Sequence, residues 1–262
     1  MILLSFDIEE FDMPFEYDRS LPFEEQIAIS VTGTQAILDI LKKNNVTATF
    51  FCTANFAVNA AGMIKQIVQD GHEVASHGYY HSEFEAGHLK SSREKLEEVS
   101  GQPVRGFRMP RMMPVDVREL RAAGYQYNSS LNPTFLPGRY NHLNSSRIWY
   151  YEGEVLQVPA SVSPSFRIPL FWLSFHNLPL SIYKRLCRRS YSTDGYLNLY
   201  FHPWEFTDLG PKEKFGFPGY VIKYSGDKMK IRFDHLIQWM KTMNYPFGTF
   251  KMFMESEIQS GK

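Results

Sequence analysis

Two histidines in the segment "ASHGYYHS", residues 75 to 82, stand four positions apart. If a helical turn begins at His77, the imidazoles of His77 and His81 point toward the same object. A metal ion is the object that paired imidazoles bind most readily, although spaced histidine pairs also occur by chance. The pair therefore predicts a metal site only if other parts of the chain supply further ligands.

Polar residues also follow the other predicted strands. In "FDIEE", Asp7 and Glu9 lie on one side of an extended chain and the isoleucine between them lies on the other. Later strands end in Arg108, Asn128 and His202. Each residue alone has an ordinary explanation as a loop acid, a surface ion pair or a turn residue. Because the carboxyl ends of parallel strands meet at one edge, we expect these groups to form one site.

Two imidazoles and one carboxylate, with positions left open for water and substrate, form a ligand set that suits zinc, with cobalt, nickel, iron and manganese as alternatives. Such a metal lowers the pKa of its water and polarises a carbonyl. Asp7 and Glu9 supply one carboxylate for the metal and one to take the proton. His202 could protonate a leaving amine or alkoxide. This set of residues predicts hydrolysis of an amide or an ester.

The elements that must position these residues alternate between strand and helix. We expect strands at residues 2–6, 46–53, 72–76, 104–108, 125–130, 153–161, 196–206 and 246–253, and helices at 32–45, 60–71, 88–101, 115–124 and 231–244. This alternation predicts a parallel sheet, either open or closed as a barrel. We expect a single domain over 1–262, with a loop-rich insertion at about 132–190, and loops at 10–30 and 132–152 that shape the pocket.

Composition excludes several classes of protein. The 262 residues are 44% hydrophobic, enough for a sizeable core, and 28 basic residues balance 28 acidic ones, so nucleic acid is not expected as a partner. Cys52 and Cys187 lie in dissimilar contexts and do not resemble a disulfide pair, which favours a reducing compartment. The segment "MILLSFDIEE" lacks the features of a secretory signal. We therefore expect a cytoplasmic location.

The stretch at residues 168–189 is apolar and aromatic and then strongly basic, with Lys184, Arg185, Arg188 and Arg189 at its end. It is too short and too interrupted to span a bilayer. A packed core hairpin with a basic cap is the interpretation we favour, and a helix lying on a membrane surface is the alternative. The alternative would place the protein at the inner face of the membrane, acting on a lipid-linked sugar.

Five segments taken in order, "LSFDIEE", "SHGYYH", "GFRMPR", "YQYNSSL" and "YFHPWE", resemble the five motifs of the polysaccharide deacetylase (NodB-homology) family of carbohydrate esterases. The resemblance covers most of residues 1 to 206. It implies a distorted (β/α) barrel and the removal of N- or O-acetyl groups from sugars with the help of a divalent metal. Some relatives of this type hydrolyse other C–N bonds.

The resemblance also implies roles for individual residues. His77 and His81 would be metal ligands, Asp7 the general base and His202 the general acid. Arg108 would orient the base or balance its charge. Pro110, Asn128 and Trp204 would bind or support the substrate, with a backbone N–H near Pro110 stabilising the developing oxyanion.

Two departures from the family pattern limit this transfer. Ile8 replaces the second of two adjacent aspartates, so we expect Glu9 as the third ligand, with Asp7 as the alternative. Asn128 replaces an aspartate that tunes the acid histidine, and an amide cannot stabilise an imidazolium by charge. The pKa of His202 is then expected to be less elevated, unless Asp194 or Glu205 substitutes for the missing acid.

The sequence as a whole predicts a metal-dependent deacetylase acting on an acetylated sugar or glycan precursor. Three alternatives remain: a C–N hydrolase for a small ureide or cyclic amide, a non-catalytic glycan-binding protein, and a two-carboxylate glycosidase, which would leave the histidine pair unexplained. The sugar, the acetyl position and the oligomeric state are not predicted.

Overall fold

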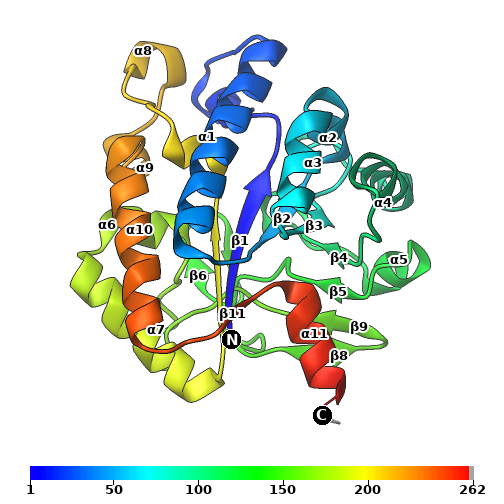
Figure 1. Cartoon of the computed structure of the whole chain (residues 1–262), viewed down its shortest axis with the longest axis vertical. Helices are drawn as coiled ribbons and strands as arrows, with labels where there is room; N and C mark the ends of the chain where they lie inside the picture. The colour runs from blue at the N-terminus through cyan, green and yellow to red at the C-terminus, as the bar shows by residue number, and fades with distance from the viewer. Residues whose placement is uncertain (260–262) are drawn as a thin grey trace.

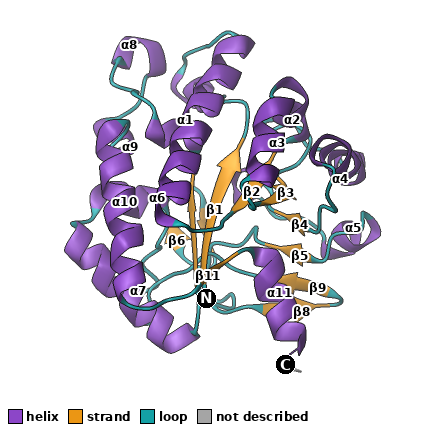
Figure 2. Ribbon diagram, viewed as in Figure 1, coloured by secondary structure: helices purple, strands orange, loops and turns teal. Residues whose placement is uncertain are grey.

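The computed structural model describes residues 1–259, which form a curled, mostly parallel sheet surrounded by helices (Figures 1 and 2). In spatial order the main sheet contains β10 (Leu197–Phe201), β1 (Ile2–Ile8), β2 (Thr49–Cys52), β3 (Glu73–Ser76), β4 (Gly106–Phe107), β5 (Tyr127–Asn128), β9 (Val155–Gln157) and β8 (Tyr150–Glu152). A short strand, β11 (Phe247–Gly248), pairs with the start of β1. Only the β8–β9 pair of this sheet is antiparallel in the described residues.

The predicted distorted barrel is confirmed as an α/β fold with a curled half-barrel sheet. The segment after β9 reaches across to β10, where the backbone N–H of Ser161 donates to the carbonyl of Asn198 at 3.0 Å. The side-chain amide of Asn198 donates to the carbonyls of Val158 and Pro159, both at 3.1 Å. Hydrogen bonds from one irregular segment therefore bring the two ends of the sheet together.

The central strand β1 has two distinct faces because side chains alternate along a strand. Ile2, Leu4, Phe6 and Ile8 pack in the large core between sheet and helices. Leu3 faces the opposite way and packs in a second cluster within the curl of the sheet. Asp7 and Glu9 continue this inward face, as the sequence predicts.

Helices surround the sheet (Figure 1). They are α1 (Phe23–Asn44), α2 (Ala54–Asn59), α3 (Ala61–Gln69), α4 (Gly87–Ser100), α5 (Val117–Ala122), α6 (Trp172–Asn177), α7 (Leu180–Asp194), α8 (Lys212–Phe215), α9 (Gly219–Ile222), α10 (Asp227–Thr242) and α11 (Phe250–Gln259). Three 3-10 helices, η1 (Met13–Tyr17), η2 (Pro110–Met112) and η3 (Pro203–Phe206), and a small hairpin of β6 (Phe135–Leu136) and β7 (Tyr140–Asn141) lie in the loops.

Several predicted boundaries are wrong; the strand expected at 196–206 ends at Phe201 and is followed by η3. Helix α1 begins at Phe23 and not near Thr32, since Pro22 precedes it and two glutamates occupy its first turn, where they complement the helix dipole. The expected last strand at 246–253 is only β11, because the Thr249 hydroxyl accepts a hydrogen bond from Met252 N–H and starts α11. The loop expected at 10–30 is therefore largely helical.

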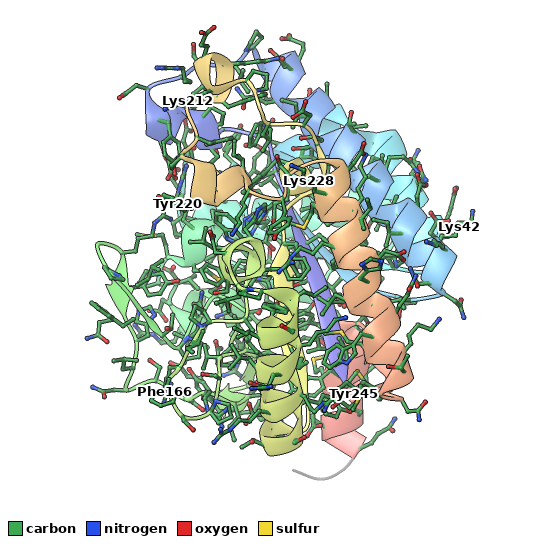
Figure 3. The ribbon with its side chains drawn as sticks, turned by 90° about the vertical axis from the view of Figure 1, so that its left-hand side faces the viewer. Lys42, Phe166, Lys212, Tyr220, Lys228 and Tyr245 are labelled. Atoms are coloured by element: carbon green, nitrogen blue, oxygen red, sulfur yellow. The ribbon has the colours of Figure 1, made fainter. Side chains whose placement is uncertain are left out.

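Residues 168–189 contain α6, the turn after it and most of α7. Phe175, Tyr183 and Cys187 of these helices are buried in the main core, and α7 packs beside α10 (Figure 3). This packing agrees with the core interpretation of the stretch, although it forms two helices and not a hairpin of strands. Within residues 1–259, no helix combines the length and apolarity needed to cross a bilayer.

Candidate metal centre and active-site cleft

Three buried side chains converge at the carboxyl ends of β1 and β3. The ligand atoms of Glu9, His77 and His81 all lie within 4.8 Å of one another. Glu9 Oε2 lies 3.3 Å from Nε2 of His77 and 3.1 Å from Nε2 of His81. The two histidines meet through a loop and not through a helical turn as first expected, and Gly78 adopts a left-handed φ of 84° between them.

Hydrogen bonds fix which nitrogen of each imidazole faces Glu9. His77 Nδ1 lies 2.9 Å from the carbonyl oxygen of Arg108, which can only accept, so Nδ1 carries the proton. His81 Nδ1 lies 2.6 Å from Oδ1 of Asp12, the carboxylate–histidine arrangement typical of metal ligands. In the neutral imidazoles, the lone pairs of both Nε2 atoms therefore point toward the Glu9 carboxylate.

Glu9 Oε2 is the buried atom that shows what kind of ligand the site fits. It has no hydrogen-bond partner among residues 1–259, although it faces two imidazole nitrogens. Three acceptors brought together in a buried place repel one another unless a cation lies between them. The donor set therefore fits a divalent metal ion, and Glu9, His77 and His81 are the residues that would hold it.

Two further acids hold the loop that carries His81. Glu10 accepts hydrogen bonds from the backbone N–H of His81 at 3.0 Å and from the Thr53 hydroxyl at 2.7 Å. Burial opposes ionisation of Asp12, but its contacts with His81 and Ser82 lower its pKa. For His81 itself, burial opposes the charged form, but the charges of Glu9 and Asp12 raise its pKa to about 8 in the absence of an ion. A bound cation would compete with that proton.

Asp7 and Arg108 form a buried ion pair beside the triad. Arg108 NH1 lies 2.6 Å from Asp7 Oδ1 and 2.9 Å from the Ser5 hydroxyl, and its guanidinium stacks 4.0 Å from the ring of Phe51. Burial alone would raise the pKa of Asp7, but the charge of Arg108, with those of the nearby histidines, lowers it. Asp7 is therefore held ionised, and Glu9 faces the histidines in the place expected for the third ligand.

His202 lies on the other side of Asp7, with its Nε2 4.0 Å from Asp7 Oδ2. Its Nδ1 lies 3.2 Å from Oε1 of Glu205, whose Oε2 lies 2.9 Å from Nε2 of His176. Burial opposes protonation of His202, but Glu205, Glu9 and Asp7 raise its pKa. Burial likewise opposes ionisation of Glu205, but the two histidines lower its pKa. His202 is thus supported by a buried His–Glu–His arrangement.

Of the two acids suggested as replacements for the family's aspartate, Glu205 contacts His202 and Asp194 does not. Asp194 pairs with Arg147 at 2.5 Å. Asn128 bonds to Gln157 at 2.8 Å and to the Ser130 hydroxyl, and it does not line the cleft. Glu205 is therefore the acid that substitutes, and its contact contributes to the raised pKa of His202.

The triad, Asp7 and His202 line a cleft with a cavity volume of about 250 Å³. Trp172, Trp204 and Tyr220 form part of its wall. The Trp204 ring stacks on His202 with centroids 5.0 Å apart, and its buried Nε1 has no partner within residues 1–259. Pro110 is buried next to Gly78 and begins η2.

The sequence did not single out Glu10, Asp12, Arg111 or His176. Asp12 and Glu10 follow the first motif directly, so the acidic run "EEFD" was the available signal. Arg111 reaches Asp12 Oδ2 at 3.4 Å and Glu16 Oε1 at 3.0 Å. His176 lies in the apolar stretch at 168–189, where no pattern indicated that it would meet Glu205.

Comparisons with known proteins agree with this geometry. Residues 20–127 match the family model for polysaccharide deacetylase. The Bacillus subtilis peptidoglycan-N-acetylmuramic acid deacetylase PdaA is 31% identical over 67 residues, which cover 26% of each protein. The Listeria monocytogenes peptidoglycan-N-acetylglucosamine deacetylase PgdA is 36% identical over 83 residues, which cover 32% of this chain and 16% of that protein. The matches thus span about a quarter or less of these relatives.

Solved structures extend the likeness of fold to almost the whole chain. A Mycobacterium smegmatis protein described as a polysaccharide deacetylase superposes with a TM-score of 0.64 at 19% identity, covering 99% of this chain and 90% of that one. A CE4 family pseudoenzyme from Bacillus anthracis superposes with a TM-score of 0.55 at 14% identity, covering 96% of this chain and 64% of that one. Motif order, triad and fold agree with the polysaccharide deacetylase (CE4/NodB) family, whose model matches residues 20–127 of this chain.

Proposed function

We propose that this protein is a metal-dependent hydrolase that removes an acetyl group from a sugar or glycan precursor. The observation that supports it is the buried triad of Glu9, His77 and His81, whose unpartnered carboxylate oxygen faces two imidazole nitrogens inside a cleft. A divalent ion bound there, zinc first among the candidates, would supply Lewis acidity to a water molecule and to the acetyl carbonyl. The related deacetylases that act on peptidoglycan glycans support a sugar substrate.

The residues around the triad are suited to move the two protons that hydrolysis requires. Asp7 is ionised and can accept the proton of the attacking water as a bond forms to the carbonyl carbon. His202 can donate a proton to the sugar nitrogen or oxygen as its bond to the acetyl carbon breaks. The products are acetate and the free amine or hydroxyl. A backbone N–H that follows Pro110 is the donor we propose for the carbonyl oxygen.

Arg108 has a supporting role in this proposal. It touches Asp7 and not the cavity, so it holds the base ionised and in place. Trp204 stacks on the His202 ring at the cleft wall and so helps to orient it.

The main alternative to an enzyme is a non-catalytic glycan-binding protein, because a pseudoenzyme with this fold is known. That rival rested on Ile8 and Asn128. Glu9 supplies the carboxylate that Ile8 cannot, and Glu205 supplies the charged partner for His202 that Asn128 cannot. Both substitutions favour an enzyme.

The test is acetate release from acetylated sugars by protein purified without a histidine tag and loaded with zinc or cobalt. Metal content is measured on the same samples, with His81→Ala and His202→Ala alongside. We expect His81→Ala to lose both metal and acetate release, and His202→Ala to keep the metal and lose most acetate release. Sugar binding without turnover in the metal-loaded protein would select the glycan-binding rival. Activity on a small ureide but on no sugar would select the C–N hydrolase. Cytoplasmic location and membrane contact through 168–189 remain predictions.

A further inference from the structure

A second cavity, with a volume of about 550 Å³, adjoins the cleft of the triad. The two cavities share five wall residues, so they form adjoining parts of one groove: Glu16, Arg111, Met112, Arg139 and Tyr140. Binding sites for compact ligands usually measure roughly 300–1,000 Å³, and the first cavity alone lies below that range. The groove therefore has room for a second unit beside the one at the triad.

A chain of ion pairs between acidic and basic side chains runs from the His81 loop to the shared wall of the groove. Arg111 reaches Asp12 Oδ2 at 3.4 Å, and it donates to the carbonyl oxygen of His81 at 3.3 Å and to Glu16 Oε1 at 3.0 Å. Glu16 Oε2 in turn accepts from Arg139 at 3.0 Å. Arg111 thus has several partners and holds the His81 loop, whereas the Arg139 side chain hydrogen-bonds within residues 1–259 to Glu16 alone.

The two arginines are not fully balanced by carboxylates at the wall. Glu16 has one negative charge and receives two guanidinium groups. Asp12 is engaged more closely by His81, at 2.6 Å, than by Arg111. Arg139 has a side chain that is 51% exposed and has most of its five N–H donors free for a ligand. A guanidinium in this state is complementary to a carboxylate or a phosphate.

Next to Arg139, the same wall presents a flat aromatic surface. The rings of Tyr140 and His142 stack with centroids 4.8 Å apart and planes 5° apart. Asn132 holds both rings, since its side-chain amide donates to the Tyr140 hydroxyl at 3.0 Å and its backbone carbonyl oxygen lies 3.3 Å from His142 Nδ1. A stacked, hydrogen-bonded pair of this kind can pack against the apolar face of a sugar ring.

We propose that the second cavity binds a neighbouring unit of the substrate that carries an anionic group, a carboxylate or a phosphate, and that Arg139 binds this group. The proposal rests on the proposed function, which places the acetylated sugar in the first cavity. Arg139 is then a residue that determines substrate specificity. The structural alternative is that Arg139 only fastens the β6–β7 hairpin to η1 through Glu16.

Binding measured by titration calorimetry separates these alternatives without relying on turnover. The probes are neutral di-N-acetylchitobiose, a disaccharide of N-acetylglucosamine and N-acetylmuramic acid, which carries a carboxylate, and N-acetylglucosamine 1-phosphate. The proteins are the zinc-loaded wild type, Arg139→Leu and the control Arg121→Leu. Arg121 is also exposed and ion-paired, with Glu154 at 2.6 Å, and it lines neither cavity.

We expect at least one anionic probe to bind the wild type about 10- to 100-fold more tightly than the neutral one, as a charge-assisted hydrogen bond allows. Arg139→Leu should remove this preference without changing affinity for the neutral probe, and Arg121→Leu should leave both unchanged. The probe that loses affinity identifies the anion as carboxylate or phosphate. Equal affinities in the wild type, or an equal loss for all probes in Arg139→Leu, would overturn the inference.

Acetate release measured on the same proteins distinguishes failure of the inference from failure of the proposed function. Release from neutral and anionic sugars at equal rates that do not depend on Arg139 would refute the inference alone. Charge-selective binding without release from any acetylated sugar would refute the proposed deacetylation, and it would leave Arg139 as an anion-binding residue.

Discussion

Replacing Glu205 with glutamine should shift the alkaline limit of the reaction to lower pH. Glu205 Oε1 lies 3.2 Å from His202 Nδ1, and both residues are largely buried. Glutamine keeps an oxygen that can accept from His202 but loses the negative charge that stabilises the imidazolium. The pKa of His202 should therefore fall, and the rate should decline at a lower pH than in the wild type.

The size of the shift follows from the geometry. At an effective dielectric constant of about 20, two unit charges separated by the observed 3.2 Å attract by about 5 kcal/mol, or about four pKa units. Glu205 is shared with His176 at 2.9 Å, and the glutamine variant keeps a hydrogen bond, so the net shift should be smaller. We expect a fall of about one to three units, the range found for a single neighbouring opposite charge.

Two measurements test this prediction. The first is kcat/KM for acetate release between about pH 5 and 10, where the alkaline rate should fall tenfold for each unit of pKa shift while the acidic plateau changes less. The second is an NMR titration of the His202 ring, which reports its pKa even without turnover. Asp194→Asn is the control, because Asp194 pairs with Arg147 and should leave both curves in place. A folded Glu205→Gln protein whose His202 titrates as in the wild type would refute the reasoning.

Further predictions concern the metal ligands and the core. Asp12→Ala should weaken zinc affinity about 10- to 100-fold, because Asp12 orients His81. Competition with a chelator measures the zinc affinity, and an affinity within twofold of wild type would contradict this role of Asp12. Without metal, the pKa of His81 rises from 6.5 to about 8, so His81 contributes about 2 kcal/mol of stability that is fully present below pH 6.5 and lost as the pH rises through 8. Chelator-treated protein should melt at a lower temperature at pH 8.5 than at 6.5, and equal melting temperatures would exclude this contribution. Gly33→Ala should lower the melting temperature markedly, because the added Cβ would lie 1.9 Å from the carbonyl oxygen of Pro203. Gly62→Ala is the control, since an added Cβ there would meet no atom within 4 Å and should leave the melting temperature unchanged. Similar effects of the two substitutions would contradict this packing.

The sequence by itself indicated the likeness to polysaccharide deacetylases and the three residues of the buried triad. "FDIEE" contains the alternation of an extended strand, and this period of two placed Asp7 and Glu9 on the inner face and Ile8 in the outer core. The alternation of strand and helix predicted a parallel sheet whose carboxyl ends gather polar residues. These features are local, since each depends on residues within a few positions of one another along the chain.

The boundaries near Thr32 and at 246–253 were wrong because local propensity is weak compared with packing and capping. The segment "PFGTFKMF" has the composition of a strand, yet the Thr249 hydroxyl accepts a hydrogen bond from Met252 N–H and caps the start of helix α11.

The partners of the site residues were decided only by tertiary structure. Glu205 meets His176 across 29 positions and Arg139 meets Glu16 across 123 positions. No periodicity in the sequence encodes such contacts, because they depend on how the sheet curls and on where the loops return. The ligand types could therefore be read from the chain, while the charges that tune and surround them are set by the fold.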